Sequence, residues 1–551
     1  MTWSKIFKLV TKKEWLFVIF LAFVVVFLGN FNLIYGWLTN PAGQVFTGIH
    51  FAALNDWFVY YSYLEQVRQG HWLFNDLFTS EPHLSFFNPL WLMVGLFATV
   101  FGLSNVLAFN VVKIFLAIIF CLLAYVFLAY IFPLAKTRKL AILLLLFSSG
   151  LGFLLISQLI KFTFNFANGH FNWPMDLWVP EFNTFLTLYY SPHFIASLIL
   201  ILLIFLNTVL FIDNKKISYG FWAGMLALIL FSFHPFHILT IFSVILIYFI
   251  VLMFQAKKIL WPLAAYYLIL FLVSLPGVLY YLYLLRFDLV MQQKALQNLC
   301  FTTPLWLTLF SLGLPLVFAV FGLKVILAKK SVDHQLVFII IWLATSLVLI
   351  YFPVNYQRRM SEGLQFPLVV LATIGILGVY QLIKNQKNQF TSIIFKQRYA
   401  LAFILFLFLA GYNLFQLAAD FYIYSTKTPL AYLDQNLVSA AAWLKNVESD
   451  KVIFNSAQNI INIIPAYSGR TVYVGHGVET VNFKSKQDEV DWFFKQNRPS
   501  EVEKNFLSQR GINYLFFGPA ERRIGTYDPD NKSYLKAVYH NSQVSIYQVL
   551  D

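Results

Sequence analysis

Long apolar blocks constrain this chain more than any other feature. They recur through most of its 551 residues, and 59% of the residues are hydrophobic, with a mean hydropathy of +0.69. A soluble domain is typically about 45–50% apolar. Blocks of about 18 residues or more with almost no charge predict transmembrane helices. The first block, at 15–36, is too long for a signal-peptide core and precedes no small-residue cleavage site, so we interpret it as a retained span.

Basic residues fall mostly in the short turns between these blocks. The formal net charge is +14, and Lys and Arg clusters precede the first block and recur at 136–139, 215–216, 257–258, 329–330 and 384–398. The positive-inside rule places these clusters in the cytoplasm, so an even number of crossings must join each successive pair. Because no basic stripe or recognition motif accompanies the charge, we expect no nucleic-acid partner.

The even number of crossings implies that the block at 86–103 does not cross the membrane. If both it and the block at 106–132 crossed, the basic cluster at 136–139 would be extracytoplasmic. The block at 86–103 is the shorter, begins with Asn88-Pro89 and contains Gly95 and Gly102, so we predict an interfacial or re-entrant helix. About eleven spans then remain, with a cytoplasmic N-terminus and an extracytoplasmic C-terminus. They are predicted near 15–36, 106–132, 140–160, 190–212, 217–233, 237–256, 259–285, 305–327, 335–353, 366–384 and 399–420.

The composition changes after Asp420. From there to the C-terminus, short apolar strands alternate with helical stretches, which favours a small mixed sheet. Strands are expected at 452–454, 471–474, 514–518 and 544–547, with a helix at 440–444. The predicted fold class is therefore an all-α polytopic membrane domain at 1–425, with a first outer loop at 37–105, followed by a small extracytoplasmic α/β domain at 426–551.

The first outer loop contains the best catalytic candidate, Asp56. It lies at the start of a run, 55–69, that could form an amphipathic helix on the membrane surface, with Trp57 and Tyr60 among the aromatics at headgroup level. A carboxylate there can act as a general base if burial brings its pKa toward the working pH. The alternative is that Asp56 only caps the first turn of an interfacial helix.

Two further outer segments contain polar candidates. Glu181 and His193 could supply a second acid that positions an acceptor or a metal, or they could be a rim carboxylate and an interfacial histidine. His234 and His237 lie on an outer turn, and two histidines three residues apart could bind a metal. No acid is local and Pro235 breaks the helical geometry, so we expect hydrogen bonds to a phosphate or sugar, or a tight turn.

Arg358 and Arg359 are the exception to the charge rule, because parity places them outside. Paired guanidinium groups at an outer rim suit a phosphate anion, which they can bind in a bidentate fork. Arg286 is a similar arginine at the outer end of a span. The alternative for the pair is a salt bridge to Glu362 or contact with lipid headgroups.

Taken together, these residues resemble the GT-C class of integral membrane glycosyltransferases, in the group related to dolichyl-phosphate-mannose protein mannosyltransferases. The resemblance covers essentially the whole chain as architecture. It rests on the acid Asp56 in the first outer loop, the interfacial Asn88-Pro89-Leu90-Trp91, Pro180-Glu181, Ser191-Pro192-His193, the outer Arg358-Arg359 and the C-terminal α/β domain.

The resemblance implies a polyprenyl-phosphate-sugar donor and a glycan, lipid or protein acceptor, within membrane lipids. By analogy, Asp56 would deprotonate an acceptor hydroxyl that displaces the lipid phosphate with inversion. Arg358 and Arg359 would hold the leaving phosphate, where developing charge needs fixed donors. Glu181 would orient the acceptor, and the first-loop aromatics would stack on sugar. No cofactor is certain: a divalent Mg²⁺ or Mn²⁺ ion is left open, and no residue is assigned as a metal ligand.

A transporter or flippase for a lipid-linked glycan is the alternative function, and a non-catalytic assembly protein is a third. A transporter would more often show inverted repeats and charged or broken helices near the midplane. The predicted spans are nearly free of ionisable residues, with Lys113 an exception, and the acids gather at one face. This distribution favours chemistry at that face.

Overall fold

The computed structural model describes residues 1–50, 56–156, 173–386, 396–429, 431–456 and 463–550. The described chain forms two compact units. The first comprises Met1–Asn30, Val112–Tyr281 and Leu299–Ala418, and the second Phe31–Val111, Leu282–Asn298 and Ala419–Asp551. One division, after Ala418, thus falls near the predicted domain boundary at 425, but the second unit also includes two earlier segments.

Nine helices in the described residues are long and apolar enough to cross a membrane. They are α2 (Lys12–Leu38), α5 (Asn105–Ile131), α6 (Ala135–Phe147) with the turns that extend it to Leu155, α9 (Pro192–Asn214), α11 (His237–Ala256), α12 (Trp261–Phe287), α14 (Leu305–Leu327), α16 (Gln365–Asn385) and α18 (Arg398–Ser425). Two further predicted spans, α10 (Ser218–Phe233) and α15 (His334–Leu349), are apolar helices of 16 residues each. The chain is a multi-pass membrane protein.

Helix α4 (Pro89–Val100) corresponds to the block at 86–103, which was predicted not to cross the membrane. It has only 12 residues, or about 18 Å at 1.5 Å per residue, whereas the hydrocarbon core is about 30 Å thick. Its N-cap is Asn88, whose side chain accepts from the Trp91 N–H, with Pro89 in the first turn. The Asn-Pro signal therefore marks the start of this short helix.

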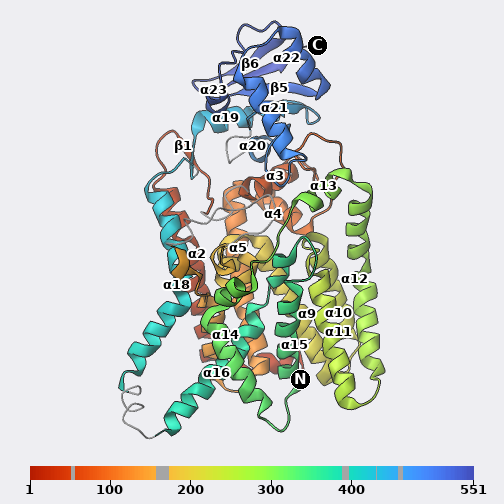
Figure 1. The fold of residues 1–551 in the computed structure, drawn as a ribbon, viewed down its shortest axis with the longest axis vertical. Helices are drawn as coiled ribbons and strands as arrows, with labels where there is room; N and C mark the ends of the chain where they lie inside the picture. Colours follow the sequence, from red (N-terminus) through yellow and green to blue (C-terminus); the bar gives the residue numbers. More distant parts are fainter. Residues whose placement is uncertain (51–55, 157–172, 387–395, 430, 457–462, 551) are drawn as a thin grey trace. The chain divides into compact units, whose positions relative to one another are not determined.

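Helix α9 is the buried centre of the first unit. It contacts α10, α11 and α15, which Figure 1 shows grouped around it. A helix that is apolar on all sides requires such surroundings. This arrangement brings the corner between α10 and α11 close to η5 (Gln357–Ser361), the turn that follows α15, because η5 contacts both α11 and α15.

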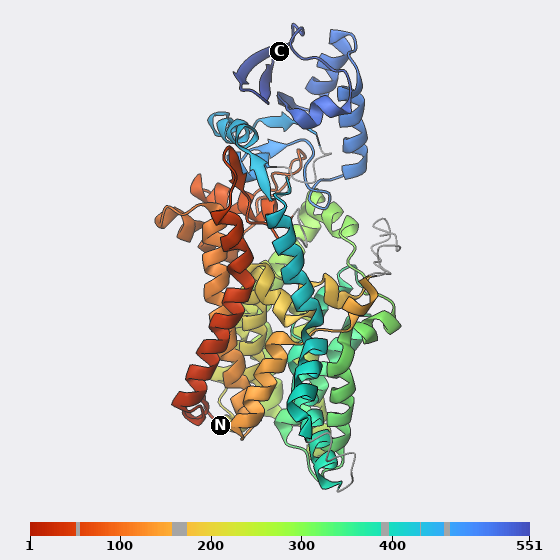
Figure 2. The same cartoon turned by 90° about the vertical axis from the view of Figure 1, so that its left-hand side faces the viewer.

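Helices α14 and α16 pack with their backbones in close contact, and they lie side by side in both Figure 1 and Figure 2. A Cβ atom added at Gly322 of α14 would collide with the Leu371 carbonyl, and one added at Gly375 of α16 would collide with the Phe318 carbonyl. Small residues at such crossings let helices approach closely in membranes.

In the second unit, the predicted first-loop helix is present as α3 (Asp56–Arg68), while residue 55 lies outside the described residues. Ten of its 13 residues are buried in the protein, so α3 has no broad exposed face, and its place at the membrane surface stays a prediction. Helix α3 packs against α4 and α20 (Ile464–Ser468), so both of its faces are covered. Its buried polar residues have partners, as in the ion pair of Glu65 with Lys445 at 2.8 Å.

The C-terminal part of the second unit is built on a five-stranded sheet of order β4-β3-β5-β7-β6, of which β5 and β6 are labelled in Figure 1. Strands β3 (Val452–Phe454), β4 (Thr471–Val472) and β5 (Ile512–Phe517) are parallel, and β7 (Ser545–Val549) is antiparallel to both β5 and β6 (Leu535–His540). Helices α21 (Phe483–Lys495) and α22 (Ser500–Gln509) connect β4 to β5, as a parallel sheet requires. The predicted combination of a polytopic helical part and a small C-terminal α/β region is confirmed.

Short elements complete the described chain. They are α1 (Trp3–Leu9), β1 (Gln44–Phe46), η1 (Gly152–Leu155), η3 (Met175–Leu177), η4 (Pro180–Phe182), α8 (Thr184–Tyr190), α13 (Leu289–Gln297), β2 (Tyr432–Asp434), α19 (Gln435–Trp443), η6 (Leu444–Asn446) and α23 (Pro519–Ile524).

Candidate functional site

Six of the predicted site residues gather in the first unit around the α10–α11 corner. His234 ends α10, His237 begins α11, and Glu362 follows η5 directly. We call the whole group the arginine–histidine cluster: Glu181, His193, His234, His237, Arg358, Arg359 and Glu362. Glu362, which the sequence argument considered only as an ion-pair partner of the arginines, lies at its centre.

Glu362 binds both histidines of the corner. Its Oε2 atom lies 2.7 Å from Nε2 of His237 and 3.3 Å from Nδ1 of His234, and the Ser197 hydroxyl donates to Oε1. Burial raises the pKa of Glu362, but the two histidines outweigh burial and bring this pKa to about 2. Burial lowers the pKa of His234 to about 4, despite the nearby carboxylate. At neutral pH, an ionised carboxylate therefore lies beside a neutral His234.

The two arginines of η5 rest on aromatic rings. The Arg358 guanidinium carbon lies 4.3 Å from the centre of the Trp178 ring, and that of Arg359 lies 4.8 Å from the Phe236 ring. Arg359 Nη1 is also 3.6 Å from Glu181 Oε1. Burial raises the pKa of Glu181, although both guanidinium groups oppose this shift. Cation–π contacts and an acid thus hold two positive charges together.

His193 lies at the edge of the arginine–histidine cluster. Its ring centre is 5.7 Å from that of His234, in an edge-on arrangement, and its Nδ1 atom is 2.8 Å from the Ser191 hydroxyl. The cluster therefore contains three histidines from two helix starts and one helix end. It combines fixed cations, hydrogen-bond donors and buried acids, which is a suitable set for an anionic group.

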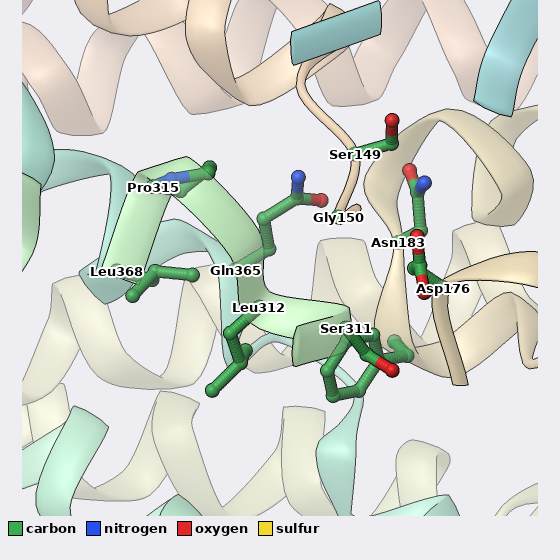
Figure 3. Close-up of a pocket in the computed structure, with 10 residues that line it drawn as sticks. Ser149, Gly150, Asp176, Asn183, Ser311, Leu312, Pro315, Gln365 and Leu368 are labelled. Atoms are coloured by element: carbon green, nitrogen blue, oxygen red, sulfur yellow. The ribbon is translucent and has the colours of Figure 1, made fainter. Parts of the chain in front are cut away.

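A pocket in the first unit lies next to a buried acid that the sequence argument missed. Figure 3 shows Gln365, Leu312 and Leu368 on one side and Ser149, Asn183 and Asp176 on the other. The Gly152 N–H donates to Asp176 Oδ2 at 3.1 Å. Burial raises the pKa of Asp176 to about 7, although hydrogen bonds from Gly152 and Ser311 oppose this shift. Asp176 carries no sequence signal beyond its rarity among apolar neighbours.

Asp56 lies in the second unit, at the first position of α3. Its Oδ1 atom is 3.1 Å from Nε2 of His476, and its side chain is 46% exposed although most of α3 is buried. His476 follows β4, so the C-terminal α/β part supplies this partner. The arrangement leaves a carboxylate that is accessible and oriented by one hydrogen bond, as a general base requires.

A buried charge network is present in the same unit. The Lys294 ammonium on α13 lies 2.8 Å from Asp76 Oδ2 and also contacts the Glu479 carboxylate. Burial would lower the pKa of Lys294, but the two carboxylates outweigh it and hold this pKa well above its ordinary value. This network could not be predicted from the sequence, because 218 positions separate Asp76 from Lys294 and a further 185 separate Lys294 from Glu479.

The remaining predicted residues are also in the second unit. Trp57 is 1% exposed, with its ring centre 4.8 Å from that of Phe109, and Tyr60 stacks on Trp91 at 4.8 Å. These neighbours occupy the ring faces that were expected to stack on sugar, so that role stays a prediction. Arg286 is exposed near the end of α12 and lies 5.9 Å from the Phe287 ring.

No family model matches this sequence, and no curated protein sequence matches it. In three dimensions, the chain is similar to the apo oligosaccharyltransferase of Archaeoglobus fulgidus, with a TM-score of 0.56 and 12% identity over 92% of this chain and 70% of that one. Archaeal oligosaccharyltransferase AglB from A. fulgidus, in complex with an inhibitory peptide and a dolichol-phosphate, gives a TM-score of 0.55 at 12% identity, with the same two shares. ArnT from Cupriavidus metallidurans, bound to undecaprenyl phosphate, gives a TM-score of 0.49 at 10% identity over 98% of both chains.

The likeness to the archaeal oligosaccharyltransferase establishes the fold. The chain has the fold of the GT-C class, and the prediction made from its outer-loop residues is confirmed at this level.

Proposed function

We propose that this protein is a membrane glycosyltransferase that moves a sugar from a polyprenyl-phosphate-sugar donor to an acceptor hydroxyl on the extracytoplasmic face, with inversion. The fold supports glycosyl transfer, and a dolichol-phosphate is bound by the A. fulgidus neighbour. The basic turns between the apolar blocks support the orientation. The observation that carries the proposal is Asp56, an accessible acid at the start of a buried helix.

In the proposed reaction, Asp56 is the general base. It takes the proton of the acceptor hydroxyl as the hydroxyl oxygen forms a bond to the anomeric carbon. The bond between that carbon and the phosphate oxygen breaks from the opposite side, and its electron pair leaves with the lipid phosphate. His476 orients Asp56 through the 3.1 Å hydrogen bond. A positioned base of this kind contributes about 10²- to 10⁴-fold to the rate.

The arginine–histidine cluster supplies the proposed phosphate-binding group. Arg358 and Arg359 are held on the rings of Trp178 and Phe236, which fixes where their charges lie. Fixed cations are most effective where negative charge develops, and here the leaving phosphate gains charge as the bond breaks. Glu181, at 3.6 Å from Arg359, is assigned to positioning this guanidinium.

The test is sugar transfer by the purified full-length protein in liposomes. A panel of polyprenyl-phosphate sugars with labelled mannose, glucose, galactose or arabinose is the probe, with membrane lipid and envelope fractions as acceptors. We expect labelled product from at least one donor, and a loss of at least about 100-fold in Asp56→Asn. Asp488→Asn, at a surface pair with Lys484, is the matched control.

The same liposomes distinguish the alternative function. Movement of a fluorescent polyprenyl-linked sugar between leaflets, with no product and no sensitivity to Asp56→Asn, would support a flippase and overturn the proposal. Equal transfer by the wild-type protein and Asp56→Asn would overturn the assignment of the base alone.

A further inference from the structure

Each of the three side chains at the centre of the arginine–histidine cluster directs one nitrogen or oxygen atom toward the other two. Nε2 of His237 lies 2.7 Å from Oε2 of Glu362 and 3.2 Å from Nδ1 of His234. Nδ1 of His234 lies 3.3 Å from Oε2 of Glu362, so each atom is close to the other two. All three side chains are at most 3% exposed. Within the described residues, this is the group of histidines and acids whose ligand atoms converge closely enough to hold an ion.

We propose that His234, His237 and Glu362 form a binding site for one divalent transition-metal ion of the Zn²⁺ type. A Zn²⁺ ion binds histidine nitrogen and carboxylate oxygen at about 2.0–2.2 Å. Ligands at that distance, at tetrahedral or octahedral angles, lie about 2.8–3.6 Å apart. Two of the three observed separations fall within this range, and only the shortest, 2.7 Å between His237 and Glu362, must lengthen, by at least about a tenth of an ångström.

The residue types select the class of metal. Two imidazole nitrogens and one carboxylate suit Zn²⁺ or a neighbouring transition metal, whereas Mg²⁺ and Ca²⁺ prefer oxygen ligands throughout. A set of three protein ligands also leaves at least one position for water or an anion. No acid lies near His234 and His237 in the sequence, but the fold brings Glu362 to them from 125 residues beyond His237.

The surroundings of the three ligands are already organised. The Ser197 hydroxyl donates to Oε1 of Glu362, which orients the carboxylate with Oε2 toward the histidines. Hydrogen bonds of this kind to the non-ligating atoms typically tune metal affinity by about 10- to 100-fold. His234 Nε2 and His237 Nδ1 have no hydrogen-bond partner among the described protein atoms, so no protein group competes for the tautomer that turns each lone pair inward.

The site would join the two segments that position Arg359. Phe236, between the two histidines, carries Arg359 on its ring, and Glu362 follows Arg359 by three residues. An ion bound by all three ligands would tie the α10–α11 corner to η5 and thereby fix where Arg359 lies. This inference concerns metal binding and does not depend on the proposed transferase activity.

The test uses the full-length protein in detergent, carrying a tag without histidines and stripped of metal with a chelator. Titration with Zn²⁺ should give one bound ion per chain and raise the unfolding temperature. His237→Gln and Glu362→Gln should weaken binding by at least about 100-fold, since each removes one of three ligands. His334→Gln, at a partly exposed histidine paired with Asp213, should bind as the wild type does.

The inference is overturned if the stripped wild type takes up no more Zn²⁺ than the folded ligand variants do. If the variants do not fold, X-ray absorption of the Zn²⁺-loaded wild type decides the question. Two imidazole nitrogens and a carboxylate oxygen around the ion support the site, and a first shell without imidazole overturns it.

Discussion

Nε2 of His476 lies 3.1 Å from Oδ1 of Asp56, although 420 residues separate the two in the sequence. The other ring nitrogen, Nδ1, accepts the Val478 N–H at 3.2 Å, so the imidazole is fixed with its Nε2–H toward the carboxylate. The C-terminal α/β part therefore contributes directly to the environment of the candidate base and is not an independent appendage.

This contact makes His476 a positioning residue. His476→Ala should lower kcat for sugar transfer by about 10- to 100-fold, because the candidate base loses the group that orients it. His476→Gln should recover much of the loss, since a glutamine amide can donate from nearly the same place. Initial rates over a range of donor concentrations check this, and a rise in KM with unchanged kcat would contradict the assignment.

Arg359→Lys should raise the KM for the donor about tenfold, because lysine cannot reproduce the forked geometry or lie on the Phe236 ring as guanidinium does. Binding of undecaprenyl phosphate to the purified protein provides an independent measurement. Arg498→Lys, at a guanidinium 4.0 Å from the Trp492 ring in the C-terminal part, should leave both quantities unchanged. Equal lipid binding by wild type and Arg359→Lys would argue against a phosphate at this arginine.

Lys294→Met should destabilise the protein by roughly 3–5 kcal/mol, because it leaves the largely buried carboxylates of Asp76 and Glu479 without their cation. Thermal unfolding in detergent measures the effect. Lys484→Met, which removes an exposed partner of Asp488, should give no measurable change. Adding Asp76→Asn and Glu479→Gln to Lys294→Met should restore part of the stability, and a further loss would contradict the electrostatic explanation.

Asp176 should make stability depend on pH. Its pKa is about 7 in the folded protein and about 3.9 in the unfolded chain, so the folded state retains a proton that the unfolded state loses. The resulting stabilisation is fully present below about pH 4, decreases as pH rises and is lost once pH passes about 7, with a total of up to roughly 4 kcal/mol. Asp176→Asn should remove this component from unfolding measured between pH 5 and pH 8. Identical slopes for variant and wild type would refute it.

Gly375→Ala should destabilise the protein by about 1–3 kcal/mol, because the added methyl group collides with the Phe318 carbonyl where α14 and α16 touch. Gly477→Ala is the control, since the nearest atom to its new methyl group would be 3.9 Å away on Phe483. Unfolding temperatures measured side by side should differ for Gly375→Ala only.

Sequence patterns predicted the helical framework well, because a membrane span must be long, apolar and uncharged whatever surrounds it. Ten of the eleven predicted spans coincide with helices in the described residues, and the short block begun by Asn88-Pro89 became the 12-residue α4. The span predicted at 140–160 overlaps α6 only as far as Phe147, and its last four residues lie outside the described residues. Strand β6 was missed because Leu535–His540 is half exposed and lacks a clear alternation.

The candidate site was harder to predict, because its contacts are between distant segments. The sequence placed Glu362 beside Arg359 as a neighbour in the chain, but the fold aims its carboxylate at His237. The aromatic run after Asp56 was interpreted as a surface helix. Because aromatic residues occur on every face of this helix, the sequence does not show whether one face or both faces are buried. Only tertiary packing covers α3 on both sides.

The position of Phe236 between two histidines and beneath Arg359 has a genetic consequence. A change at Phe236 alters the support of the guanidinium and the spacing of the imidazoles at once, so its effect will not add to those of changes at Arg359 or Glu362. Each single substitution should therefore cause most of the loss of function that the combined substitutions cause. We therefore expect natural substitutions in the α10–α11 corner to be tolerated only together with compensating substitutions in η5.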